Sequence, residues 1–90
     1  MIQLQIIVSG EVQGVGYRYY TQMKAIQFGI TGWVKNLQEG GVEILASGEN
    51  DNLERFIDEV RRGNPFSTVD HIEVNETEKT ETYRSFAIKY

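Results

Sequence analysis

A glycine-rich run over residues 10–18 joins a strand-like segment directly to a helix-like segment. Residues 2–8 alternate apolar and more polar side chains, which predicts a strand with one well-buried face. Residues 17–28 place their core-type side chains at helical spacing, and Gly29 is suited to cap the end of that helix. A short strand at 31–37 follows. The chain therefore opens with a β-α-β crossover, in which the two strands run parallel.

The middle of the chain predicts a hairpin and a second helix. The turn at 39–41, Glu-Gly-Gly, leads into a strand over residues 42–47. Asp51 and Glu54 fit a capping box at the start of the helix, and the Gly63-x-Pro65 break ends it.

Strands are expected again at 69–74 and 86–90, separated by a polar and exposed segment from 75 to 85. The element order is then β-α-β-β-α-β with an extra C-terminal strand. This order predicts an α+β sandwich of the ferredoxin-like type, with a mostly antiparallel sheet and two helices packed on one face. The 90 residues are expected to form a single domain, 1–90.

Composition excludes several classes of function. The chain has no cysteine, so it can hold neither a disulfide nor a cysteine nucleophile or metal ligand. A net charge of −4 argues against nucleic-acid binding, which needs a basic face. No apolar stretch approaches the roughly 18 residues of a membrane span, and no signal peptide is recognised, so we expect a cytoplasmic protein.

The glycine-rich run has the features of a phosphate cradle. Gly14 and Gly16 let the backbone turn tightly and approach a ligand, and the helix that follows presents free N–H groups. Arg18 adds a fixed charge and a planar fork of donors. The run is no Walker loop, because no Gly-Lys-Ser/Thr follows, and Tyr19 stands where a dinucleotide-binding fingerprint needs its third glycine.

The predicted topology brings a second polar residue to this cradle. Parallel strands end at the same edge of a sheet, so the run at 10–18 and Asn36, near the end of the second strand, should meet there. Arg18 and Asn36 are therefore expected to lie close together.

Two segments resemble the signatures of the acylphosphatase family. They read Gly10-x-Val12-Gln13-Gly14-Val15-x-Tyr17-Arg18 and Gly32-Trp33-Val34-Lys35-Asn36, with Gly40, Val42 and Gly48 following at the expected spacing. The resemblance implies a monomeric, metal-free and cofactor-free hydrolase of small acyl phosphates such as acetyl, benzoyl or carbamoyl phosphate, with phosphate or sulfate as a product-like ligand. It also implies that Arg18 grips the phosphate and that Asn36 positions the attacking water. The phosphate-binding segment would comprise Gln13, Gly14, Val15, Gly16, Tyr17 and Arg18.

Other side chains have plainer explanations. Aromatic residues could stack on an aromatic acyl group, but Tyr17 and Trp33 are expected to fill or cover the core instead. Thr21 could brace the loop or simply pack in its helix. His71, the sole histidine, is expected to be an exposed strand residue, and Lys35 a solvated charge near the edge of the site.

Two other functions compete with hydrolysis. The chain could be an anion-binding module without catalysis, although such a module would not need the Asn36 amide. It could also be an RNA-binding sheet, because similar sandwiches stack bases on aromatic side chains. The acidic balance of the chain disfavours RNA binding.

Overall fold

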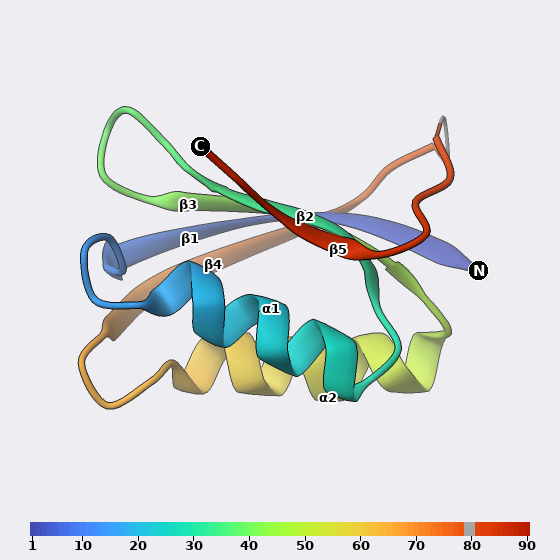
Figure 1. The fold of residues 1–90 in the computed structure, drawn as a ribbon, viewed down its shortest axis with the longest axis horizontal. Helices are drawn as coiled ribbons and strands as arrows, with labels where there is room; N and C mark the ends of the chain where they lie inside the picture. The colour runs from blue at the N-terminus through green and yellow to red at the C-terminus, as the bar shows by residue number, and fades with distance from the viewer. Residues whose placement is uncertain (79–80) are drawn as a thin grey trace.

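The computed structural model describes residues 1–78 and 81–90 and contains two helices and five strands in these residues (Figure 1). In chain order they are β1 (Ile2–Glu11), α1 (Tyr17–Gln27), β2 (Thr31–Asn36), β3 (Val42–Gly48), α2 (Asn50–Arg62), β4 (Thr68–Glu76) and β5 (Phe86–Lys89).

The strands form one sheet in the order β4-β1-β3-β2-β5, and both helices lie against the same face of it (Figure 1). Strands β1 and β2 each pair antiparallel with β3, so they run parallel to one another and end at the same edge. The last strand, β5, pairs parallel with β2 and closes that side of the sheet. The predicted ferredoxin-like α+β sandwich is confirmed, and the C-terminal strand forms the edge of the sheet next to β2.

Some boundaries differ from the prediction. β1 continues to Glu11, beyond the expected end at residue 8, because β4 keeps pairing with it past a shift of register between Ser9 and Gly10. The prediction of a capping box that begins at Asp51 is wrong, because α2 begins at Asn50 with Glu49 as its N-cap. Asp51 therefore lies within the first turn, where its charge still favours the helix dipole.

The segment expected to be polar and exposed, residues 75–85, is only partly irregular. Its first two residues belong to β4, and Thr77 is held to β1 by two hydrogen bonds to Gln3. Most of its described residues are exposed, as predicted, while residues 79 and 80 lie outside the described part of the chain.

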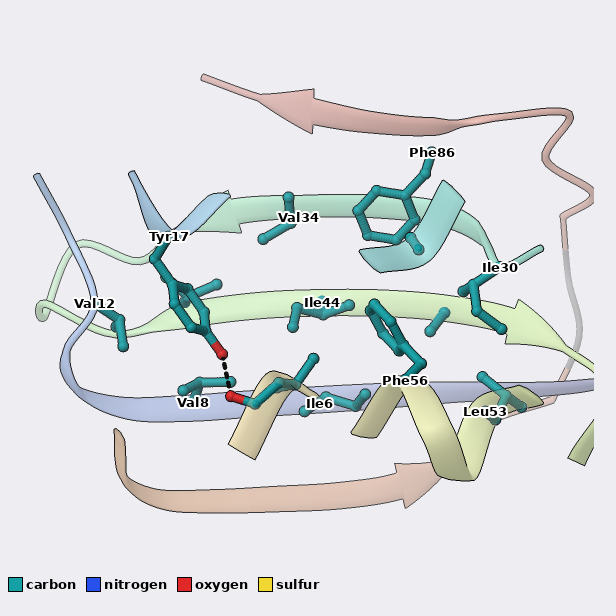
Figure 2. Packing of buried hydrophobic residues seen from close by; sticks show 14 residues of the cluster. Ile6, Val8, Val12, Tyr17, Ile30, Val34, Ile44, Leu53, Phe56 and Phe86 are labelled. Atoms are coloured by element: carbon teal, nitrogen blue, oxygen red, sulfur yellow. Dashed lines mark hydrogen bonds between the residues drawn. The ribbon is translucent and has the colours of Figure 1, made fainter. Parts of the chain in front are cut away.

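The core lies between the sheet and the two helices (Figure 2). Ile6, Val34 and Ile44 project from the sheet toward Phe56 of α2, and none of these side chains is accessible to solvent. Tyr17, the first residue of α1, also points into this core and donates a hydrogen bond of 2.7 Å to the carbonyl of Val60 (Figure 2). Its expected role in the core is confirmed, and the bond ties the start of α1 to the last turns of α2.

Replacing Tyr17 with phenylalanine should lower the free energy of unfolding by about 1 to 3 kcal/mol, because the buried Val60 carbonyl loses its donor from this hydroxyl. Urea unfolding would measure the change, with Tyr19→Phe, which removes an exposed hydroxyl, as a control. A loss below about 0.5 kcal/mol would contradict the role given to this bond.

Candidate functional site

The loop between β1 and α1 presents the start of a helix to a small cleft. Gly14 and Gly16 have φ angles of 73° and 76°, a left-handed conformation that side chains with a Cβ rarely adopt. Gly16 is the N-cap of α1 and provides no side chain to bond the first N–H groups of the helix. The first turn also has no acidic residue. The positive end of the helix dipole is therefore available to an anion at this loop.

Arg18 is held at this cleft by the last residues of the chain. One guanidinium nitrogen, Nη1, donates to the carbonyl of Lys89 at 2.9 Å, and the guanidinium carbon lies 4.7 Å from the centre of the Tyr90 ring. The planar group is thus oriented by a hydrogen bond and by stacking. Because a guanidinium carries several donors, this arrangement leaves others for a bound anion.

Asn36 is the last residue of β2, at the edge where β1 also ends. Its side-chain oxygen Oδ1 is buried and finds no hydrogen-bond partner in the described residues. A buried acceptor without a partner costs about 1 to 3 kcal/mol, so such an atom in a cleft is a candidate for contact with a ligand or water.

Arg18 and Asn36 line the same cleft, as the predicted topology requires. The cleft has a volume of about 160 Å³, small enough for a compact anion and below the roughly 300–1,000 Å³ of pockets that hold drug-sized ligands. It is lined by Val12, Gly14, Gly16, Tyr17, Arg18, Tyr19, Asn36, Ile88 and Tyr90.

Gln13 and Val15, two residues of the expected phosphate-binding segment, are absent from that lining. The Gln13 side-chain amide donates to the carbonyls of Leu37 and Gly41, at 2.7 and 2.8 Å. The Val15 carbonyl accepts a 2.8 Å hydrogen bond from Asn64 Nδ2. Gln13 thus ties the loop to the hairpin that follows Asn36, and Asn64 ties it to the segment after α2.

The tyrosines of α1 differ in their surroundings. Burial raises the pKa of Tyr17, whose side chain is in the core, so the cleft can use its backbone N–H alone. Burial, followed by the hydrogen bond and charge of Glu59, raises the pKa of Tyr20 to about 12. Neither phenol can exchange a proton near neutral pH. Tyr19 is different, because it is exposed and lines the cleft.

The remaining candidates lie away from the cleft. Trp33 was expected to fill or cover the core, and of these two roles it takes the second: it alternates with the buried Val34 and covers the sheet face without helices. The Lys35 and Lys89 ammonium groups lie 5.3 and 4.4 Å from its ring centre. His71 is an exposed residue of β4, as predicted. Thr21 is fully buried and donates to the Tyr17 carbonyl within α1, which favours packing.

Sequence reasoning missed the contribution of β5 to the site. Ile88 and Tyr90 line the cleft, and the Lys89 carbonyl holds Arg18. The pairing of β5 with β2 places these residues there, and no local pattern in the sequence specifies that pairing. Residues 1–78 and 81–90 contain no group of three or more His, Cys, Asp or Glu that could hold a metal ion. None of the helices they form is long and apolar enough to cross a membrane.

Comparisons with known proteins identify the family of the chain. The family described as Acylphosphatase matches residues 4–88. The chain is 49% identical to an acylphosphatase of Archaeoglobus fulgidus and 46% identical to one of Bacillus velezensis, over the full length of both chains in each case. The crystal structure of the acylphosphatase from Bacillus subtilis superimposes with a TM-score of 0.96 at 48% identity, covering all of both chains.

Proposed function

The chain belongs to the acylphosphatase family and is a hydrolase of acyl phosphates, and from this premise we propose that the cleft between Arg18 and Asn36 is its active site. The observation that carries the proposal is the pairing, in one small cleft, of a fixed guanidinium with a buried amide oxygen that has no hydrogen-bond partner among the described residues. The first group suits a phosphate, and the second suits a water.

The chemistry of an acyl phosphate makes this set of groups sufficient. Its leaving group is a weakly basic carboxylate, which needs no strong acid to protonate it. What remains is to hold the phosphoryl group, to stabilise the charge on its oxygens and to align the water opposite the leaving group. The N–H groups at Gly16–Arg18 and the Arg18 side chain suit the first two tasks.

In the proposed step the water oxygen attacks phosphorus while the phosphorus–oxygen bond to the carboxylate breaks. The electron pair of that bond leaves with the carboxylate. Asn36 Oδ1 accepts a hydrogen bond from the water and orients it, but an amide is too weak a base to take a proton. The proton passes to an oxygen of the phosphoryl group, as suits a loose transition state.

Gln13 and Asn64 support this assembly from outside. Each peptide unit is planar, so a hydrogen bond that fixes a carbonyl also fixes the direction of the N–H group in the same unit. Such bonds can keep the N–H groups of this loop directed toward one point. Asn64 fixes the Val15 carbonyl, and with it the plane that carries the Gly16 N–H. Gln13 joins the loop to the hairpin beside Asn36, so both halves of the site are held together.

The direct test is hydrolysis of benzoyl phosphate by the purified protein, followed with and without EDTA. We expect turnover that EDTA leaves unchanged and that inorganic phosphate inhibits competitively. A folded protein that binds phosphate without turnover would instead be an anion-binding module. Independence from metal ions, the monomeric state and the cytoplasmic location remain predictions from the sequence.

A further inference from the structure

An apolar groove of about 710 Å³ adjoins the cleft. It runs along one side of α1 and is bounded by the segment that follows α2. Its most exposed apolar side chains are Tyr19, Met23, Ile26 and Phe66, with exposed fractions of 62, 51, 64 and 77%. Of the seven large apolar side chains exposed in the described residues, these four line the groove. Such a gathering marks a surface that binds something apolar.

The groove and the cleft share a wall. Gly16 and Tyr19 line both of them, whereas Asn36 lines the cleft alone. An in-line displacement places the leaving group on the side of phosphorus away from the attacking water. If Asn36 holds the water, the acyl group therefore leaves on the side of phosphorus away from Asn36. The groove lies on the side of the cleft formed by Tyr19, and Asn36 does not line it.

The charges around the groove favour an uncharged occupant. Lys24, the cationic residue of its lining, lies 3.6 Å from the Glu59 carboxylate and 5.7 Å from the centre of the Tyr20 ring. Its positive charge is thus already balanced by the Glu59 carboxylate. The other side chains of the lining are apolar, aromatic or amide groups, and the volume is in the range of small-molecule sites.

We propose that this groove binds the acyl group of the substrate, and that the enzyme therefore prefers acyl phosphates with an aromatic or extended aliphatic group to acetyl phosphate. The inference rests on the proposed function, because it places the phosphate in the Arg18 cleft. Tyr19 forms the shared wall, and Met23 and Phe66 are specificity-determining residues beyond it.

The test compares benzoyl and acetyl phosphate in the wild type and in the double variant Met23→Ala/Phe66→Ala. We expect the ratio of the two kcat/KM values, benzoyl over acetyl, to fall about tenfold in the variant, mainly through KM for benzoyl phosphate. The kcat/KM for acetyl phosphate and the inhibition constant of inorganic phosphate should stay within about twofold of wild type, because neither ligand reaches the groove.

Val74→Ala, which trims an exposed apolar side chain on β4, is the matched control and should leave the ratio unchanged. A ratio in the double variant within twofold of wild type, in an active enzyme, would overturn this inference alone. Failure of the wild type to hydrolyse either substrate would overturn the proposed function and this inference with it. A wild-type dimer that the double variant dissociates in sedimentation would assign the groove to a second copy, and would also overturn the inference.

Discussion

Replacing Arg18 with alanine is expected to lower kcat/KM for acyl phosphates at least about 10²- to 10³-fold. The variant removes the charge and the planar donors that the Lys89 carbonyl and the Tyr90 ring hold at the cleft. Because these donors are proposed to contact the phosphoryl group before and during the reaction, KM should rise and kcat should fall together. Inorganic phosphate should lose most of its inhibitory power for the same reason.

Two further variants separate charge from geometry at this position. Arg18→Lys keeps a cation but loses the planar fork, so it should recover only a small part of the lost activity. Arg84→Ala removes an arginine that is exposed outside the cleft, and it should leave activity within twofold of wild type. Full activity in Arg18→Lys would show that a simple point charge is enough and would contradict the role given to the fork.

Replacing Asn36 with alanine is expected to lower kcat by a similar factor, at least about 10²- to 10³-fold, with little change in phosphate inhibition. The amide oxygen is proposed to orient the water, and other groups are proposed to hold the phosphate. The free energy of unfolding should stay the same or rise, because a buried oxygen without a protein partner in the described residues is removed.

Asn75→Ala is the matched control for this change, because it removes an exposed amide from β4. It should leave kcat unchanged. A loss of activity below tenfold in a folded Asn36→Ala protein would remove Asn36 from the mechanism. A loss that came entirely through KM would instead make Asn36 a phosphate-binding residue.

The convergence of Arg18 and Asn36 was predictable because it depends on strand direction alone. A β-α-β crossover fixes two strands as parallel, and their ends then meet at one edge whatever lies between them. The structure confirms this even though β3 is inserted between β1 and β2. The periodic apolar positions and the glycine after α1 were likewise local signals, and both helices form where those signals place them.

Features that depend on tertiary pairing were not predictable. β5 lies beside β2 and thereby brings the Lys89 carbonyl to Arg18. No local sequence pattern specifies this pairing. The role of Gln13 as a brace depends on how closely the loop approaches Leu37. At Asp51 a local signal was present but misleading: the sequence contains a capping motif there, whereas α2 begins before it, at Asn50.

The most direct test of the site measures two quantities in three proteins: kcat for benzoyl phosphate and the inhibition constant of inorganic phosphate, in wild type, Arg18→Ala and Asn36→Ala. The proposed mechanism predicts that Arg18→Ala loses both catalysis and phosphate inhibition. It predicts that Asn36→Ala loses catalysis and keeps the wild-type inhibition constant. Equal effects of both variants on the inhibition constant, or an active Asn36→Ala enzyme, would contradict the division of tasks between the two residues.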